Sequence, residues 1–284
     1  MRVVIIGLGL IGGSIGLALK QTNEPGWEVV GYLRRSEAVS DVLKLGVVDR
    51  VEMDLEHATN GAELVIIATP VLAIREVLAH IAHCLSPGCI VTDTGSTKLE
   101  VMRWAEDLLP PTVYFVGGHP MAGKEIHGIQ AAEAGLFQGC IYCITSVRKT
   151  PPWVVDKVVN TVKQLGAEPF FVDAHEHDDL VAGISHLPML LSATLVSTTT
   201  NDASWNKLSR LAASGYRDFT RLASGNPEVN AHICFTNKQA IIRWIDEFTK
   251  ELARCRQLVD AGGKQLEEAL TEANRARREW LNRI

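Results

Sequence analysis

The sequence lacks the features that define several classes of protein. No uninterrupted apolar run reaches the roughly 18–20 residues that a membrane-spanning helix needs, so we expect no membrane partner. Met1 and Arg2 lead directly into an apolar segment, so we expect no signal peptide. Six cysteines among 284 residues do not indicate a disulfide framework. Together these observations favour a cytoplasmic globular enzyme.

A strong charge of one sign is also missing. The formal net charge is −5, from 28 basic and 33 acidic residues, which does not indicate nucleic acid or an anionic membrane as a partner. Cys140 and Cys143 have the spacing of a metal or redox pair, but they lie in an apolar, strand-like run with no second pair nearby. We interpret them as buried strand residues and predict no metal site.

Short apolar runs rich in valine and isoleucine recur through the first half of the chain. They are Val3–Ile6, Glu28–Leu33, Glu63–Ala68, Cys89–Thr92, Val113–Val116, Ile141–Thr145 and Phe170–Val172. Segments of helical length separate most of them. Continuous apolar strands that alternate with helices predict an α/β fold with a parallel sheet covered on both faces.

The pattern changes after about Val172, where the β-rich runs end. We therefore predict a Rossmann-type dinucleotide-binding domain over residues 1–173 and an all-helical substrate and dimerisation domain over residues 174–284. In the second part, apolar residues recur at steps of four and three: Ile241, Ile245, Phe248, Leu252, Cys255 and Val259. This stripe suits helix-on-helix packing, either within the domain core or at a dimer seam, and the pattern does not separate the two.

A glycine-rich turn follows the first predicted strand and opens a helix. It consists of Gly7, Leu8, Gly9, Leu10, Ile11 and Gly12. In such a turn the first glycine allows the tight bend, the second lets a pyrophosphate approach the backbone, and the third permits close packing of helix on strand. The phosphates then bind free N–H groups at the positive end of the helix. The turn predicts a dinucleotide site.

The end of the second predicted strand bears on the choice of dinucleotide. An acidic residue is expected there when NAD is bound, because it accepts hydrogen bonds from the ribose 2′-hydroxyl. This segment has Arg34, Arg35 and Ser36 instead, which suit a 2′-phosphate. We therefore predict NADP, with NAD as the alternative. Thr69 and Pro70, after the strand ending at Ala68, are assigned to the same cofactor site.

Four polar segments are candidates for the chemistry: Thr92–Lys98, Gly117–Gly123, Ser185–Pro188 and Gly215–Arg221. The first two follow strands, at the sheet edge where α/β proteins bind ligands. We expect His119 on a glycine-rich loop there, and a histidine with an ordinary pKa near 6.5 suits proton transfer at neutral pH. In the last segment, two arginines four residues apart can share one helix face and bind one anion.

These segments resemble the prephenate/arogenate dehydrogenase family of tyrosine biosynthesis. The residues that carry the resemblance are Gly7–Ser14, Thr92-Asp93, Ser96, Lys98, Gly117–Gly123, His177-Asp178, Ser185–Pro188, Gly215–Arg221 and Gly225–Pro227, in the family's order. In many members a second histidine follows the Ser-His-Leu-Pro motif, which is Ser185–Pro188 here. This chain has Met189 at that position. The resemblance implies a cofactor domain, a helical dimerisation domain and a homodimer.

The resemblance also implies roles for individual residues. His119 looks like the base or hydrogen-bond acceptor for the substrate hydroxyl, and Ser96 looks like its partner at that hydroxyl. His186 resembles a second active-site histidine near the substrate side chain and the nicotinamide. A histidine that only packs between helices is the alternative for His186. For His177 and Asp178, capping the helix that opens the second domain is the preferred interpretation.

A cationic anchor for the substrate carboxylate completes the implied site. Arg221 resembles the residue that binds the substrate carboxylate, with Arg217 and Asp218 beside it. The implied reaction is oxidative decarboxylation of prephenate to 4-hydroxyphenylpyruvate, or of arogenate to tyrosine, and the sequence does not distinguish the two. More distant alternatives are a β-hydroxyacid dehydrogenase, which shares the two-domain plan, and a non-catalytic dinucleotide sensor. Feedback inhibition by tyrosine is not readable from the sequence.

Overall fold

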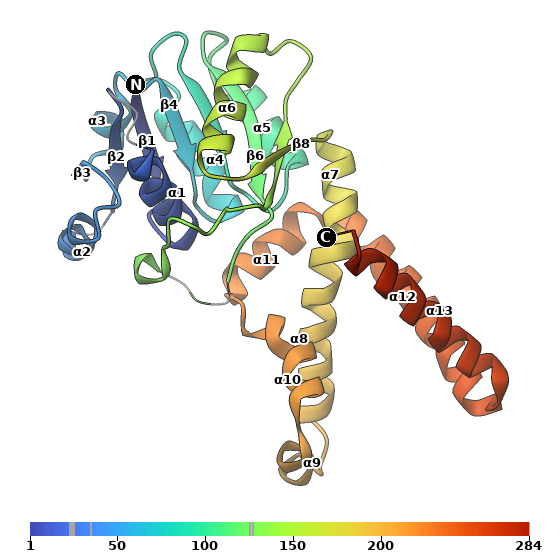
Figure 1. Ribbon diagram of the computed structural model, residues 1–284. Coiled ribbons are helices and arrows are strands. Elements are labelled where there is room, and N and C mark those ends of the chain that lie inside the picture. Colours follow the sequence, from blue (N-terminus) through green and yellow to red (C-terminus); the bar gives the residue numbers. More distant parts are fainter. Residues whose placement is uncertain (23–25, 35, 125, 127, 284) are drawn as a thin grey trace. The chain divides into compact units, whose positions relative to one another are not determined.

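The computed structural model describes residues 1–22, 26–34, 36–124, 126 and 128–283. Within these ranges the first half forms an eight-stranded sheet of order β3-β2-β1-β4-β5-β6-β7-β8, shown in Figure 1. The strands are β1 (Arg2–Ile6), β2 (Glu28–Tyr32), β3 (Arg50–Glu52), β4 (Leu64–Ile67), β5 (Ile90–Asp93), β6 (Tyr114–Pro120), β7 (Ile141–Thr145) and β8 (Glu168–Phe171). The strand order reverses between β1 and β4, which is the topology of a dinucleotide-binding sheet.

Alternate residues of the strands face two separate apolar cores. In β1, Val3 and Ile5 belong to one core and Val4 and Ile6 to the other, as the two-residue period of a strand requires. Helices α1 (Leu10–Gln21), α2 (Val39–Lys44) and α6 (Pro152–Gln164) supply the first core. Helices α3 (Leu55–Thr59), α4 (Val71–Ile81) and α5 (Leu99–Leu108) supply the second. The prediction of an α/β sheet covered on both faces is confirmed.

Two details of the sheet differ from the expectation. Strand β7 runs antiparallel to β6, whereas the other neighbouring pairs are parallel. The connection between them contains only the short 3-10 helix η2 (Ile129–Ala131) in its described part, and a parallel return needs a longer crossover. Strand β3 was not predicted, because its three residues carry no apolar run. Cys143 lies buried in β7, as predicted for a strand residue, whereas Cys140 precedes β7 and is only half-buried.

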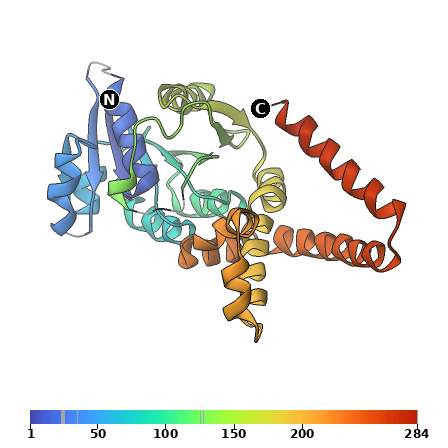
Figure 2. The ribbon, with the colours of Figure 1, turned by 60° about the horizontal axis from the view of Figure 1, so that its bottom comes forward.

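The second half of the chain is helical in its described residues. Its elements are α7 (Ala174–Val181), the π-helical turn η3 (Ala182–His186), α8 (Leu187–Thr200), α9 (Trp205–Leu211), α10 (Ser214–Thr220), the 3-10 turn η4 (Arg221–Ser224), α11 (Pro227–Thr236), α12 (Lys238–Ala261) and α13 (Lys264–Leu281). Figure 2 shows the short turn that joins α12 to α13. Gly262 and Gly263 form that turn, with φ of +65° and +84° that favour glycine.

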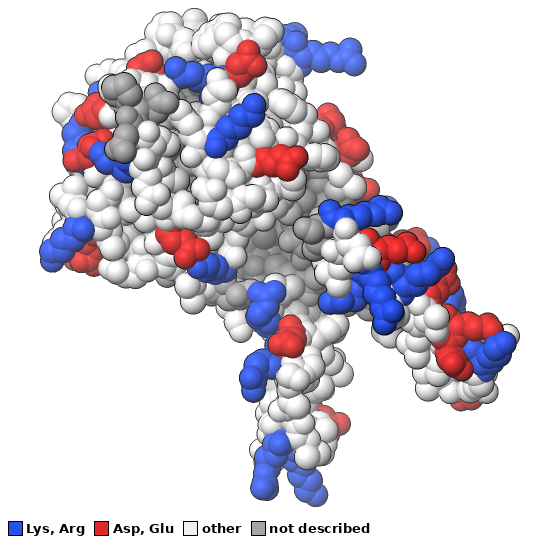
Figure 3. Space-filling view, in the orientation of Figure 1, with Lys and Arg blue, Asp and Glu red and all other residues white. Residues whose placement is uncertain are grey.

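Contacts divide the chain into two compact units, Met1–Lys238 and Gln239–Ile284. Helices α7 to α11 therefore belong to the same compact unit as the sheet. Compactness and evolutionary domain limits are different properties, so the boundary near residue 173 stays a prediction. On the face visible in Figure 3, the α/β part carries scattered basic and acidic side chains among uncharged ones.

The continuous helical segment Ala174–Thr200 is strongly apolar, although polar residues interrupt its apolar runs. By length and mean hydropathy it is apolar enough to cross a membrane. The same composition also occurs in the packed helices of water-soluble proteins. Here the polar side chains of His177, Asp178, His186 and Ser192 are buried against other parts of the fold, so this segment is built into the first compact unit.

Candidate functional site

The glycine-rich turn has the geometry of a phosphate cradle. Gly7 has φ of +100°, and a Cβ there would lie 2.6 Å from the carbonyl oxygen of Ala68. A Cβ on Gly12 would lie 2.1 Å from the carbonyl oxygen of Gly7, so helix α1 approaches the turn after β1 too closely for any side chain. A Cβ on Gly9, in contrast, would meet no atom within 4 Å. Gly9 is the N-cap of α1 and faces open space, which leaves room for an anion.

A cavity of about 510 Å³ extends from this turn along the edge of the sheet. Arg34, Thr69 and Pro70 line it, and the Oγ1 of Thr69 is buried with no hydrogen-bond partner among the described residues. Among the described residues of the lining, none at the end of β2 is a carboxylate, and the acidic residue is Glu76, from α4. The cradle and the orphaned hydroxyl fit a dinucleotide.

The three polar residues after β2 have different outcomes. Arg34 is exposed and lines the cavity. Ser36 is exposed as well, but it opens the short helix η1 (Ser36–Ala38) and does not belong to the lining. Arg35 lies outside the described residues. Arg34 therefore carries the structural support for a 2′-phosphate site, and its role remains a prediction.

A buried ion pair fixes the loop that carries Ser96. Asp93, the last residue of β5, pairs with Lys98, and both side chains are fully buried. The same carboxylate accepts hydrogen bonds from the N–H of Gly95 (2.7 Å) and from the N–H of Gly118 in β6 (3.0 Å). The segment between Asp93 and Lys98 is thus tied to the neighbouring strand, and Ser96 lies half-buried within it.

His119 lies within β6, directly opposite Cys143 of β7, so the expected location on a loop is wrong. The antiparallel pairing with β7 extends β6 through Gly117, Gly118 and Pro120, which read as a loop in the sequence. The Nδ1 atom of His119 lies 2.9 Å from the Nε2 atom of His177. Burial, followed by the charges of His177, Lys98 and His186, lowers the pKa of His119 well below its ordinary value of 6.5.

Asp178 lies at the centre of a hydrogen-bond network. Its Oδ1 atom accepts from the N–H of Lys98 (2.7 Å) and lies 2.8 Å from the Nδ1 atom of His177, while Oδ2 accepts from the N–H of Leu99 (3.0 Å). Asp178 therefore caps α5, 79 residues away, and the predicted capping of its own helix is wrong. The N-cap of α7 is Asp173, whose carboxylate accepts from the N–H of His175.

The same network reaches His186. The side-chain nitrogen of Asn237 donates to the carbonyl oxygen of Asp178 (2.6 Å) and lies 3.3 Å from the Nδ1 atom of His186. The Nε2 atom of His186 is buried with no hydrogen-bond partner among the described residues. Burial lowers the pKa of His186 to about 4, partly offset by the charge of Asp178. His186 ends the π-helical turn η3, and such turns recur at functional sites.

The arginine expected to bind the substrate carboxylate and the two residues expected to flank it lie on a separate segment. Arg217 and Asp218 are exposed on α10, and Arg221 is exposed at the first position of η4, so the two arginines do not share one continuous α-helix. This segment is held to α8. The hydroxyl of Tyr216 lies 2.8 Å from that of Thr199, and Ser192 accepts from the N–H of Ala223 (2.9 Å). Figure 3 shows basic and acidic side chains exposed on this part of the molecule.

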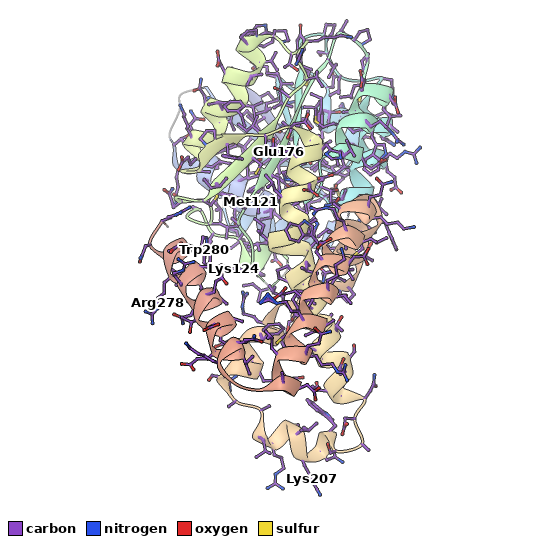
Figure 4. The ribbon with its side chains drawn as sticks, turned by 90° about the vertical axis from the view of Figure 1, so that its right-hand side faces the viewer. Met121, Lys124, Glu176, Lys207, Arg278 and Trp280 are labelled. Carbon is purple, nitrogen blue, oxygen red and sulfur yellow. The ribbon has the colours of Figure 1, made fainter. Side chains whose placement is uncertain are left out.

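The network contains residues that the sequence reasoning missed. Figure 4 labels Glu176 in α7 and Met121 just beyond β6, which mark the two segments that carry His177 and His119. The sequence motif includes His177 and Asp178 but predicts only a local helix-capping role for them. Asn237 belongs to no motif, and nothing in the sequence connects it with Asp178, 59 residues earlier. The histidine–carboxylate pattern at 177–178 was the available signal.

Family models and curated proteins give matches over most of the chain. Residues 15–170 match the family described as prephenate dehydrogenase, nucleotide-binding domain. Residues 173–273 match the family described as prephenate dehydrogenase, dimerization domain. A prephenate dehydrogenase of Bacillus subtilis strain 168 is 38% identical over 260 residues, which are 91% of this chain and 70% of that protein.

Solved structures give the same result. The prephenate dehydrogenase of A. aeolicus, in complex with hydroxyphenyl propionate and NAD+, is similar with a TM-score of 0.91 and 28% identity over 98% of both chains. The arogenate dehydrogenase of Synechocystis is similar with a TM-score of 0.83 and 29% identity, over 99% of this chain and 100% of that one.

Proposed function

The chain belongs to the prephenate dehydrogenase family, and on that premise we propose that it catalyses the oxidative decarboxylation of prephenate to 4-hydroxyphenylpyruvate. The observation that carries the proposal is the environment of His119. This histidine is neutral at physiological pH because its pKa is depressed, it lies on the strand next to the Ser96 loop, and its Nδ1 atom is held by His177. A neutral, oriented imidazole suits the removal of a hydroxyl proton.

The reaction assigns a task to each group. Prephenate carries a hydroxyl on C4 of a cyclohexadiene ring and a carboxylate on C1. His119 accepts the hydroxyl proton while Ser96 hydrogen-bonds to the same oxygen and orients it. The bound nicotinamide supplies the acceptor for the hydride of C4. The bond from C1 to its carboxylate then breaks, carbon dioxide leaves, and the ring becomes aromatic. The protein contributes alignment and a base.

Substrate binding is assigned to the exposed arginines. Arg221 is proposed to bind a substrate carboxylate, because a guanidinium matches its two oxygens. Arg217 and Asp218 are proposed to flank it. His186 is proposed to contact the substrate side chain, because its buried Nε2 atom has no protein partner among the described residues. The hydrogen bonds of α10 and η4 to α8 hold the backbone on both sides of Arg221 in place, which supports this role.

The cofactor proposal separates two levels. The chain uses a nicotinamide dinucleotide, and we propose NADP because Arg34 lines the cavity at the position where an acid would favour NAD. The A. aeolicus relative was solved with NAD+, so the preference of this chain rests on Arg34. A homodimer formed through the helical domain and a cytoplasmic location complete the proposal.

A second candidate substrate is arogenate, which carries an amino group where prephenate has a side-chain keto group. The similarity to the Synechocystis arogenate dehydrogenase favours testing it. The decisive assay measures kcat/KM for prephenate and arogenate, each with NAD and with NADP. We expect prephenate with NADP to be the best of the four combinations. The absence of turnover in all four would contradict the proposed function.

Two substitutions test the assigned residues. His119→Asn should reduce kcat by roughly 10²–10⁴-fold, the usual contribution of a general base, while cofactor affinity stays within about twofold. Unchanged turnover would reject His119 as the base.

Arg221→Ala should raise the KM for substrate roughly 10–100-fold through the loss of charged hydrogen bonds and leave cofactor binding unaltered. A KM for substrate equal to that of the wild type would reject Arg221 as the residue that binds the carboxylate.

A further inference from the structure

The two histidines of the site differ in how the fold holds them. His119 and His186 each contact a neighbouring side chain through Nδ1. The partner of His119 is a ring nitrogen of another histidine, and the partner of His186 is the amide nitrogen of an asparagine. His177 faces His119, and Asn237 faces His186. Both partners are themselves held by Asp178, through its side chain in one case and its main-chain carbonyl in the other. The direction of each hydrogen bond can therefore be followed outward from Asp178.

The first chain runs from Asp178 to His119. The Oδ1 atom of Asp178 already accepts the N–H of Lys98, and a carboxylate oxygen of this kind is an acceptor. The Nδ1 atom of His177, 2.8 Å away, must then carry the proton. In the neutral form of the His177 ring, a proton on Nδ1 leaves a lone pair on Nε2, and in that form His177 accepts from His119. The proton of His119 then lies on Nδ1, which leaves its Nε2 atom with a lone pair that can accept a hydrogen bond.

The second chain runs from Asp178 to His186. The carbonyl oxygen of Asp178 can only accept, so the atom of Asn237 beside it at 2.6 Å is the amide nitrogen. The second hydrogen of that nitrogen is directed to the Nδ1 atom of His186, at 3.3 Å. Nδ1 is then the acceptor, and the proton of neutral His186 lies on Nε2. This N–H is buried and has no protein partner among the described residues.

From these directions we infer that His177 and Asn237 are positioning residues that hold the two site histidines in opposite tautomers. His119 offers a lone pair at Nε2, and His186 offers an N–H at Nε2. Under the proposed function, on which this inference rests, the lone pair receives the substrate hydroxyl proton. The N–H donates to an oxygen of the substrate side chain. The depressed pKa values of both histidines support the inference, because tautomers exist only in the neutral ring.

The tautomers can be measured without any turnover. The enzyme with 15N-labelled histidine, at pH 7.5 and without ligands, is examined by long-range 1H–15N NMR, and His119→Asn and His186→Gln assign the signals. We expect protonated Nδ1 in His119 and protonated Nε2 in His186. The reverse tautomer at either ring would overturn the inference. If the tautomers are as expected and no substrate turns over, the proposed function fails and the inference stands.

Kinetics then test the role of His177. His177→Phe removes the acceptor and should lower kcat roughly 10–10³-fold, with the KM for substrate and the affinity for cofactor within about threefold. His177→Gln retains an acceptor oxygen and should recover most of kcat. The matched control is His175→Phe, at an exposed position of α7, which should behave as wild type.

Two outcomes would contradict the positioning role. One is a wild-type kcat in His177→Phe. The other is an equal loss of kcat in His177→Phe and His177→Gln while the NMR signals of His119 stay unchanged in both.

Since Asn237→Ala frees the Nδ1 atom of His186, it should shift His186 to a mixture of tautomers and raise the KM for substrate. A single unchanged tautomer of His186 in that variant would exclude Asn237.

Discussion

Asp93 and Lys98 form an ion pair whose side chains are both fully buried at the end of β5. The pair joins the first and last residues of the loop that carries Ser96. Its carboxylate also accepts the N–H of Gly118, the residue before His119. A single buried contact thus fixes the loop and the strand that are proposed to meet at the substrate hydroxyl.

The first prediction concerns this ion pair. Lys98→Met should lower the free energy of unfolding by about 3–5 kcal/mol, because it leaves the carboxylate of Asp93 buried without its counter-charge. Urea denaturation measures the effect. Asp107→Asn, at an exposed position of α5, is the control and should change stability by less than about 0.5 kcal/mol. A stability loss in Lys98→Met no larger than in this control would show that the pair contributes little.

The second prediction separates two glycines of the phosphate cradle. Gly12→Ala should destabilise the fold, because its Cβ would lie 2.1 Å from the carbonyl oxygen of Gly7. Gly9→Ala should fold normally, since its Cβ meets no protein atom within 4 Å and its backbone φ of −98° suits any residue. The new methyl would occupy space assigned to the pyrophosphate, so cofactor affinity should fall at least about tenfold, a loss of about 1.4 kcal/mol.

Thermal melts and titration calorimetry with NADP check both variants. A normal affinity in Gly9→Ala would mean that the pyrophosphate does not approach this turn. A normal melting temperature in Gly12→Ala would mean that the helix can shift away from the strand without cost.

The third prediction concerns cofactor choice. Arg34→Ala should weaken NADP binding by roughly 10–100-fold, because charged hydrogen bonds contribute about 1.5–3 kcal/mol. It should leave NAD binding within about twofold. Ser36→Ala is the matched control, since Ser36 does not line the cavity. Equal losses for NADP and NAD in Arg34→Ala would assign Arg34 to a part of the cofactor that both dinucleotides share.

The fourth prediction follows from the pKa of His186, which burial lowers to about 4. The unfolded chain takes up this proton near pH 6.5, while the folded chain takes it up only near pH 4. Stability should therefore be fully present above pH 6.5 and should fall as the pH is lowered towards 4. The groups that face His186 are Asp178, His177 and Asn237.

Urea denaturation between pH 4 and pH 8 tests this dependence. His186→Gln should remove part of the loss, up to about 3 kcal/mol at pH 4. Above pH 7.5, where the histidine is neutral in both states, the stability curves of the variant and the wild type should run parallel. Parallel curves over the whole range would contradict the lowered pKa.

The fifth prediction concerns the apolar stripe of α12. Ile241, the first residue of the predicted stripe, is buried, whereas Ile245, Phe248, Leu252 and Val259 are between 37% and 63% exposed in the single chain. Exposed apolar residues in a row suit an interface between copies, which supports the dimer-seam interpretation over the core interpretation. Phe248→Glu should shift the enzyme towards monomer in light scattering at micromolar concentration, and Lys250→Glu should not. A monomeric wild type would contradict the seam.

The sequence predicted those parts of the fold that depend on local patterns. The apolar strands β1, β2, β4 and β5 and the glycine turn are such parts, because burial on both faces and a tight turn restrict residue type locally. The antiparallel entry of β7 was not predictable, since strand direction depends on the connection and on pairing between distant residues. That pairing also turned His119 from a loop residue into a strand residue.

The site shows the same division. His119, Ser96 and His186 were found as residue types in recognisable segments. The partners that orient the histidines were not, because the hydrogen bonds of Asp178 cross 79 or 80 residues in one direction and 59 in the other. Polar contacts of such separation leave no periodic trace in a single sequence. Arg35 lies outside the described residues, so its predicted role is unchanged.

Asp178 has a consequence for the order in which the enzyme matures during synthesis. The sheet, the phosphate cradle and His119 leave the ribosome first, whereas His177, Asp178 and Asn237 follow later in the chain. A nascent chain that ends before α7 contains the glycine-rich turn and His119 but lacks the groups proposed to orient His119. Under the proposed function, the residues of the cofactor cradle are therefore synthesised before the groups proposed to orient His119.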